Sequence, residues 1–203
     1  SCNNKLLHET YLEKMKFLFQ NNGCPEEIAA LRLTIESCVK DSPLKQEILK
    51  LYTQYQTLSK GQSAPLSSLK DTNGKNYTFA DFRGKVVIVD VWATWCCSCI
   101  EKMPKFMQLK NEFKPYKDIL FLTISIDRKS NRDKWLKAFK ENKMTDMLNL
   151  ISDPTANSHF ETEYHITGIP RYFIIDKEGK IITVFAPGPG KEMKTLIQNT
   201  LKR

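Results

Sequence analysis

The strongest constraint in this sequence is an apolar run that leads directly into a cluster of cysteines. Val86–Val91 is a continuous β-branched run that is interrupted only by Asp90. Such a run is typical of a central strand that is buried on both faces. It continues into the segment Trp92–Cys99, which holds three cysteines, and Ile100–Phe113 then reads as a helix. The chain is therefore expected to place these cysteines where a buried strand passes into a helix.

Strands and helices alternate in the rest of the chain beyond residue 60. We expect a hairpin turn at Asn73-Gly74, strands at Ile119–Ile126, Tyr172–Asp176 and Ile181–Phe185, and helices at Arg132–Asn142, Thr155–Tyr164 and Lys191–Leu201. The order β-α-β-α-β-β-α predicts an α/β fold, in which a mixed β-sheet is flanked by helices on both faces.

The first 60 residues have a different pattern. Residues 4–59 carry apolar side chains at helical spacing, in three stretches that short turns separate. Ser42 is the expected N-cap of the third helix and Pro43 its first residue. We predict a small helical segment over residues 1–60 and an α/β domain over residues 61–203.

Composition excludes several classes of protein. The chain has 203 residues, of which 41% are hydrophobic and 27% charged, so it has the composition of an ordinary globular protein. No apolar run approaches the ~20 residues that a membrane-spanning helix needs. The net charge is +8, but the 31 basic residues are spread along the chain without an arginine-rich tract. We therefore expect no nucleic-acid partner.

The spacing of two cysteines points to redox chemistry. Cys96 and Cys99 form a Cys-x-x-Cys pair, which can form a reversible disulfide. At the start of a helix, free N–H groups and the helix dipole stabilise a thiolate. Cys96 is therefore the expected attacking thiolate, and Cys99, one turn into the helix, the more shielded resolving thiol.

Several motifs make residues 61–203 resemble the thioredoxin superfamily, in particular the membrane-associated TlpA/ResA-like thiol-disulfide oxidoreductases. They are Lys85–Cys96, Met103-Pro104, Thr167–Pro170 and Phe173–Lys180. The resemblance implies a thioredoxin-like sheet and a protein that exchanges its own dithiol with client proteins, without a cofactor and without a metal. It favours a role as a reductant.

The resemblance also assigns residues around the cysteines. It implies a cis Ile169–Pro170 bond that lies against the disulfide and pairs with an extended client peptide, with Trp95 as a further client contact. Asp90 falls at the buried acid that exchanges protons with the second cysteine. An acid in an apolar run is expected to have a raised pKa and can act as a general base. The alternative for Asp90 is a carboxylate that hydrogen bonds satisfy.

Four residues depart from the family pattern and are expected to tune the site. Cys97 and Ser98 stand between the redox cysteines, where the family usually has a proline. Lys102 stands where the family often has an active-site glutamate, and Arg171 follows the proline. Cys97 adds a third sulfur, which could divert oxidation or could be a bystander. A cation at Arg171 near the sulfurs would favour thiolate.

The start of the chain suggests where the protein works. Ser1-Cys2 looks like the mature start of a bacterial lipoprotein, in which the thiol of the cysteine carries lipid. The alternative is a stray cysteine. With the helical segment, this pattern predicts an extracytoplasmic protein of the cell envelope that faces the periplasm, with an upstream membrane or periplasmic electron donor.

Three other functions stay open. Cys96, Cys97 and Cys99 are soft ligands that suit copper binding or delivery. A thiol peroxidase would need threonine three residues before its reactive cysteine, where this chain has Ala93. The helical segment could also serve as a docking module.

Overall fold

The computed structural model describes residues 42–142, 144–152 and 160–202. The chain divides into two compact units, residues 1–62 and 63–203. In the first unit, helix α3 (Pro43–Gln56) begins as predicted, because the Ser42 side chain accepts a hydrogen bond from the backbone N–H of Lys45 at 3.2 Å. The predicted helices before residue 42 and the predicted lipid site at Cys2 lie outside the described residues.

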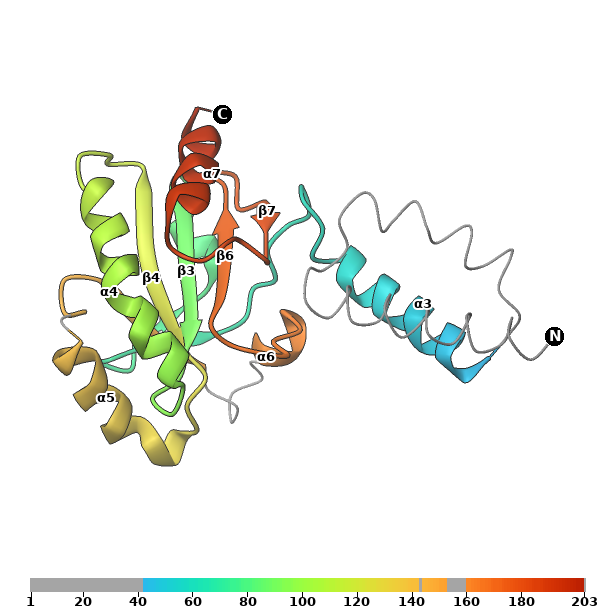
Figure 1. Ribbon diagram of the computed structural model, residues 1–203, viewed down its shortest axis with the longest axis horizontal. Helices are drawn as coiled ribbons and strands as arrows, with labels where there is room; N and C mark the ends of the chain where they lie inside the picture. Colours follow the sequence, from blue (N-terminus) through green and yellow to red (C-terminus); the bar gives the residue numbers. More distant parts are fainter. Residues whose placement is uncertain (1–41, 143, 153–159, 203) are drawn as a thin grey trace. The chain divides into compact units, whose positions relative to one another are not determined.

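The second unit contains a seven-stranded mixed sheet with the order β2-β1-β5-β4-β3-β6-β7. Figure 1 shows its strands β4, β3, β6 and β7 side by side. Its strands are β1 (Leu69–Asp71), β2 (Asn76–Tyr77), β3 (Val86–Trp92), β4 (Ile119–Ser125), β5 (Leu148–Ser152), β6 (Arg171–Ile175) and β7 (Ile181–Thr183). Its helices are η1 (Phe79–Phe82), α4 (Cys97–Glu112), η2 (Lys129–Asn131), α5 (Arg132–Glu141), α6 (Phe160–Glu163) and α7 (Lys191–Leu201). Strands β3, β4 and β5 are parallel, and the other pairs are antiparallel.

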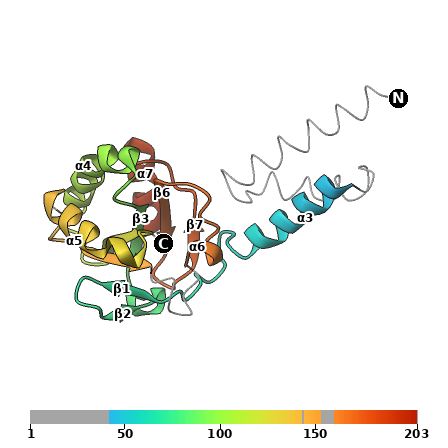
Figure 2. The same cartoon turned by 90° about the horizontal axis from the view of Figure 1, so that it is seen from below.

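Strand β3 lies inside the sheet and is buried along its whole length. Its even-numbered residues Val86, Ile88 and Trp92 pack in one cluster with side chains of α4, α5 and α7. On the other face, Tyr164 beside α6 stacks on Phe173 of β6 with ring centroids 5.1 Å apart. Helices therefore cover both faces, as the sequence predicts (Figure 2).

One strand was not predicted from the sequence. Strand β5 has asparagine at its second position and serine at its end, and asparagine is depleted in strands. In the fold, Asn149 is buried and accepts a hydrogen bond from Thr123 Oγ1 at 2.8 Å. Its Nδ2 donates to the carbonyl oxygens of Met144 and Met147, each at 2.8 Å. These tertiary partners make the position favourable, and no local pattern reveals them.

The predicted turns agree with the backbone. Gly74 joins β1 to β2 and Gly179 joins β6 to β7, and both have positive φ, which favours glycine. Of the predicted helix Thr155–Tyr164, the described part forms α6, and residues 153–159 lie outside the described residues.

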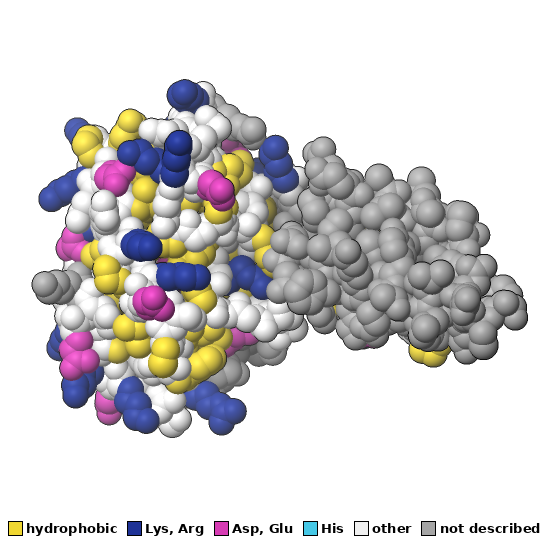
Figure 3. Space-filling model, in the orientation of Figure 1, with side chains coloured by type: hydrophobic (Ala, Val, Ile, Leu, Met, Phe, Trp, Pro, Cys, Tyr) yellow, Lys and Arg dark blue, Asp and Glu magenta, His cyan; other side chains and the backbone are white. Residues whose placement is uncertain are grey.

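The surface of the second unit mixes charges of both signs. Figure 3 shows lysine and arginine side chains interspersed with aspartate and glutamate over the face that carries α4 and α7. Ion pairs join some of them, such as Lys194 with Glu112 at 2.6 Å. This face therefore carries separate charged groups and no continuous basic tract.

The Asn149 contacts predict a specific loss of stability. The substitution Asn149→Asp replaces a donor that faces two carbonyl oxygens by a carboxylate oxygen, so we expect the free energy of unfolding to fall by about 3 kcal/mol. Urea unfolding of the oxidised protein measures this change.

Asn142→Asp is the matched control for this substitution. Asn142 also donates to a carbonyl oxygen, that of Ala138, but it is only partly buried at the end of α5. The same chemical change is expected to cost about 1 kcal/mol or less there. Equal losses at the two sites would show that the buried contacts of Asn149 do not stabilise β5.

Candidate active site

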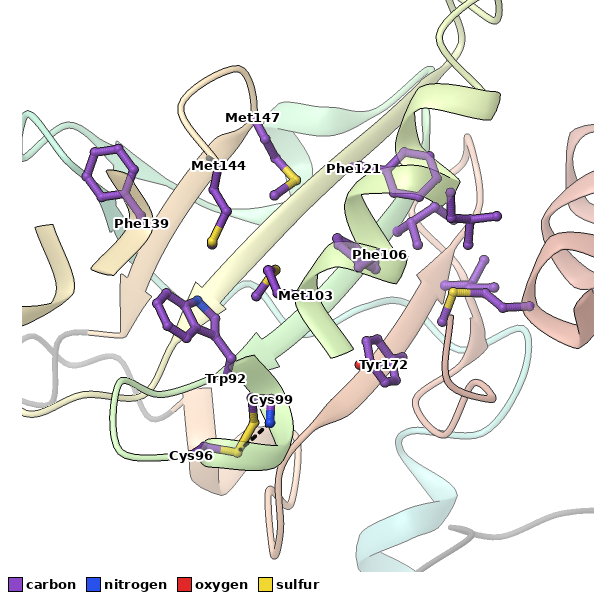
Figure 4. Packing of buried hydrophobic residues seen from close by; sticks show 14 of the residues in the cluster. Trp92, Cys96, Cys99, Met103, Phe106, Phe121, Phe139, Met144, Met147 and Tyr172 are labelled. Atoms are coloured by element: carbon purple, nitrogen blue, oxygen red, sulfur yellow. Dashed lines mark hydrogen bonds between the residues drawn. A yellow bond between two sulfur atoms is a disulfide. The ribbon is translucent and has the colours of Figure 1, made fainter. Parts of the chain in front are cut away.

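The two predicted redox cysteines are joined at the start of α4. Cys96 is the N-cap residue of this helix and forms a disulfide with Cys99, with Cα atoms 5.3 Å apart. The Cys96 Sγ accepts a hydrogen bond from the backbone N–H of Cys99 at 3.2 Å (Figure 4). The sulfur of Cys96 therefore lies where the unpaired N–H groups and the dipole of α4 favour negative charge.

The two sulfurs differ in their access to solvent. The side chain of Cys99 is fully buried, whereas Cys96 keeps 6% of its surface exposed. This agrees with the predicted order of shielding. A disulfide in this geometry can be opened from outside at Cys96, while Cys99 stays enclosed beneath the helix.

The two residues between the cysteines are exposed. Ser98 Oγ lies 3.5 Å from Cys96 Sγ, so its hydroxyl contacts the outer sulfur. Cys97 is a free, exposed thiol beside the disulfide. The structure thus gives Ser98 a direct contact with the redox pair and leaves Cys97 outside it.

An acidic residue that sequence reasoning missed holds the loop before Cys96. Asp127 is buried after the end of β4, and its carboxylate accepts hydrogen bonds from the backbone N–H of Thr94 at 2.8 Å and from Thr94 Oγ1 at 2.7 Å. Ser125 Oγ also donates to this carboxylate, at 2.7 Å. Because β3 and β4 are parallel, their carboxyl ends meet at one edge of the sheet. An acid directly after the predicted strand was the signal that could have revealed it.

The loop before β6 reaches the same edge of the sheet. Arg171 pairs with Val91 in the antiparallel register, so Pro170 lies beside the end of β3 from which the cysteine loop leaves. The Ile169–Pro170 peptide bond is cis, which confirms the prediction. Ile169 and Pro170 are half-buried, and Trp95 is 63% exposed. An exposed indole and a chain segment without strand pairing therefore flank the redox pair.

Asp90 lies inside the protein beneath α4. It is fully buried, and neither carboxyl oxygen has a hydrogen-bond partner among the described residues. The described residues therefore offer the Asp90 carboxyl no hydrogen bond of the kind that the alternative requires. Burial raises the pKa of Asp90 to about 8, although the charge of Lys102 on α4 opposes this shift. Its side chain shares the face of β3 with Ile88 and Trp92, whose cluster includes Cys99.

The remaining predicted tuning residues lie farther out or on another face. Lys102 is exposed on α4. The Arg171 guanidinium lies over the ring of Phe185, 3.8 Å from its centroid, and its Nη2 is 3.5 Å from Thr167 Oγ1. Since side chains alternate along a strand, Arg171 faces away from the side of β6 that carries Tyr172 and α4.

The described residues contain neither a candidate metal site nor a candidate membrane-spanning helix. No group of three or more His, Cys, Asp and Glu side chains in the described ranges is placed to hold a metal ion. No helix in the part of the chain that the structure describes is long and apolar enough to cross a membrane.

Known proteins share this architecture. A family model described as Redoxin matches residues 59–198. The chain is 31% identical to the thioredoxin-like protein YneN of Bacillus subtilis over 63% of this chain and 75% of that protein. It is 28% identical to the thiol-disulfide oxidoreductase ResA of Bacillus thuringiensis subsp. konkukian, over 75% of this chain and 82% of that protein.

Solved structures agree with these relatives. The thioredoxin domain of a thiol-disulfide oxidoreductase from Bacteroides vulgatus superposes with a TM-score of 0.61 at 27% identity, over 70% of this chain and 97% of that chain. A thiol:disulfide interchange protein from Bacteroides sp. gives a TM-score of 0.62 at 26% identity, over 72% and 93%. With its Cys96–Cys99 disulfide at the start of α4, the chain belongs to the Redoxin family, as a TlpA/ResA-like thiol-disulfide oxidoreductase of the thioredoxin superfamily.

Proposed function

We propose that Cys96 and Cys99 reduce disulfides in client proteins, with Cys96 as the nucleophile. The Cys96 thiolate attacks one sulfur of a client disulfide, forms a mixed disulfide and releases the first client thiolate. Cys99 then attacks Cys96, so that the Cys96–Cys99 bond forms and the second client thiolate leaves. Two electrons pass to the client. The observation that carries this proposal is the position of Cys96 as the N-cap of α4 above a fully buried Cys99.

Asp90 is the proposed base for the second attack. It lies on the same face of β3 as Ile88 and Trp92, whose cluster includes Cys99, and with a pKa of about 8 its carboxyl is ionised in about one molecule in ten at pH 7. This ionised form can take the proton of the Cys99 thiol. A buried acid whose pKa lies near the working pH is suited to proton transfer.

The surface around the disulfide is the proposed client site. The exposed indole of Trp95 offers an apolar contact, and the backbone at Ile169 and Pro170 offers hydrogen-bonding groups to an extended peptide. Ser98 at the outer sulfur and Lys102 near Asp90 are proposed to tune the redox pair. We propose that Cys97 and Arg171 also tune the redox pair.

We propose that the protein acts outside the cytoplasm, where client disulfides form and persist. The resemblance to membrane-associated relatives supports an upstream electron donor in the membrane or periplasm. A lipid on Cys2 would hold the protein near that donor. Residues 1–60 would then form a helical segment between the anchor and the redox domain of residues 61–203. The copper-binding alternative gains no support from the described residues, in which Cys96 and Cys99 are bound to each other.

A trapping experiment tests the order of the two cysteines. Because Cys99→Ser removes the resolving thiol, this variant is expected to accumulate at least about tenfold more mixed disulfide with a disulfide-containing test protein than the wild type. Non-reducing electrophoresis and mass spectrometry measure the adduct. Cys97→Ser is the control and is expected to resolve normally. Accumulation with Cys96→Ser instead would reverse the assignment.

The reduction potential tests the direction of electron flow. Equilibration in a series of redox buffers, followed by mass-tagged alkylation, is expected to show a two-electron transition of Cys96 and Cys99 at about −270 mV or below, as for thioredoxin. A midpoint near the ~−120 mV of a strong oxidant would mean that the protein makes disulfides in its clients.

The buried carboxyl of Asp90 predicts how stability depends on pH. Its pKa in the folded protein, about 8, is above the ordinary value of 3.8 for an aspartate side chain. The folded state therefore binds the proton of Asp90 more tightly than the unfolded state does. The stability that this proton contributes is fully present below about pH 3.8 and is lost as the pH rises through 8. Asp90→Asn removes the titration. We expect the oxidised variant to gain stability over the wild type by up to about 1.4 kcal/mol for each pH unit between pH 5 and 8.

Urea unfolding at several pH values measures this difference. Asp118→Asn is the control. Asp118 is exposed and pairs with Lys177, and the hydrogen bond from Lys177 lowers the pKa of Asp118. Its effect on stability is expected to be small and to have no midpoint near pH 8. An Asp90→Asn difference that does not vary with pH would mean that Asp90 is ionised throughout this range.

A further inference from the structure

A row of four buried polar side chains crosses the sheet beneath α4. Asp90 of β3 pairs directly with Tyr172 of β6 on one side and with Thr123 of β4 on the other, and Thr123 pairs with Asn149 of β5. All four residues are buried. Paired residues on neighbouring strands point to the same face, so the four side chains lie side by side across the sheet.

Of the four residues, only Thr123 and Asn149 have hydrogen-bond partners for these side chains among the described residues. Thr123 Oγ1 donates its single hydrogen to Asn149 Oδ1, and Asn149 Nδ2 donates to two backbone carbonyls. Both oxygens of Asp90 and the hydroxyl of Tyr172 have no hydrogen-bond partner among the described residues. Three adjacent orphaned polar atoms in a protein interior require an explanation, and they coincide with the proposed base.

The number of donor hydrogens in this row limits which groups can stabilise an ionised Asp90. An ionised carboxylate needs donors, and the one hydrogen of Thr123 is already given to Asn149. The hydroxyl of Tyr172 therefore carries the one hydrogen of this row that is not committed. Opposite residues of antiparallel strands have Cβ atoms about 5 Å apart, so the two side chains are neighbours. Because a tyrosine hydroxyl extends farther from the sheet than a carboxyl, their contact requires a tilted ring or one bridging water.

We propose that Tyr172 is a positioning residue for the redox reaction, which donates its hydroxyl hydrogen to Asp90 whenever that carboxyl is ionised. This inference rests on the proposed role of Asp90 as the base. It names Tyr172 as the group that stabilises the ionised carboxyl of Asp90, which is the form that takes the proton from Cys99.

The surroundings of Tyr172 suit this task. Its ring stacks on Phe106 of α4 with centroids 6.0 Å apart, and both belong to the cluster that contains the disulfide (Figure 4). Burial and the nearby Asp90 raise the pKa of Tyr172, so its hydroxyl keeps its hydrogen over the working pH range. The position therefore holds a neutral donor in a fixed ring orientation.

Other groups around Asp90 act differently. Lys102 of α4 lowers the pKa of Asp90 from the exposed surface. Cys99 of α4 supplies the proton when the protein is reduced, and Thr123 of β4 carries no charge. Arg171 of β6 lies on the other face of its strand. Within the row of four, Tyr172 is thus the uncharged donor beside Asp90, and Lys102 is the charged group.

The step on which Tyr172 acts is the release of the client. The proton of the Cys99 thiol passes to Asp90, the sulfur of Cys99 forms the bond to Cys96, and the bond between Cys96 and the client breaks as the client thiolate leaves. Without the Tyr172 hydroxyl, the ionised form of Asp90 is less stable. A smaller fraction of molecules then holds the base in its active form near pH 7.

The test measures the rate of client release from a preformed mixed disulfide between pH 6 and 10. For Tyr172→Phe we expect the midpoint of the pH profile to rise by about one unit, with release about tenfold slower at pH 7 and close to wild type at pH 10. Tyr164→Phe is the matched control. It removes a buried tyrosine hydroxyl on the opposite face of the sheet, one that donates to the carbonyl of Pro65, and the midpoint is expected to stay unchanged.

Two further variants separate this inference from the proposed base. Asp90→Asn is expected to slow release at pH 7 and to leave a pH profile that follows the ionisation of the Cys99 thiol alone, and adding Tyr172→Phe to it is expected to change nothing more. If Asp90→Asn releases the client at the wild-type rate, the proposed base fails. If Asp90→Asn is slow but Tyr172→Phe keeps the wild-type midpoint, only the role of Tyr172 fails. A slowing by Tyr172→Phe that is equal at every pH, or that persists without Asp90, would mean a structural effect and would overturn the inference.

A second replacement keeps the test valid if Tyr172→Phe does not fold. Replacing Tyr172 by 3-fluorotyrosine preserves the ring and the hydroxyl but makes the hydroxyl a stronger donor. The midpoint of client release is then expected to move down, because a stronger donor stabilises the ionised carboxyl further. An unchanged or raised midpoint would contradict the inference.

Discussion

The complete burial of β3 is the constraint on which the rest of the redox domain depends. Residues Val86–Trp92 pair with parallel β4 on one edge and antiparallel β6 on the other, and none of them reaches solvent. Helix α4 packs over one face of the strand. Since both edges and both faces are occupied, the point at which the chain leaves β3 is fixed. The first turn of α4, with Cys96 as its cap, is therefore held in one place relative to the sheet.

The same burial creates the chemical environment beneath the disulfide. Asp90 would be destabilising in any strand that is buried for stability alone, because its charged form loses hydration and none of the described residues forms a hydrogen bond to it in this structure. The protein accommodates it by raising its pKa to about 8, so that the neutral form prevails. Local rules of folding are most often broken at functional sites, and this strand breaks them beneath α4, the helix that carries the disulfide. An energetic cost in the core thus coincides with the region of the proposed proton transfer.

The site combines a rigid support with an exposed surface. Asp127 holds Thr94 by two hydrogen bonds, and the N–H of Cys99 holds the sulfur of Cys96. Between these anchors Trp95 stays exposed, next to the edge where the cis Ile169–Pro170 bond enters β6. The outer sulfur of the disulfide, that of Cys96, is therefore presented by a loop that is held in place on both sides. A client can approach this loop without any rearrangement of the core.

Periodicity and local motifs determined most of what this protein is. The run into β3, the Cys-x-x-Cys spacing at a helix start and the turn glycines are local signals, and each was interpreted correctly because neighbouring residues alone encode it. Strand β5, the Asp127 anchor and the pairing of Asp90 with Tyr172 were decided by the tertiary structure. They depend on which strands become neighbours and in what register. A buried polar group is favourable or orphaned according to partners that are distant in sequence, so only the assembled sheet shows that Asn149 is satisfied and Asp90 is not.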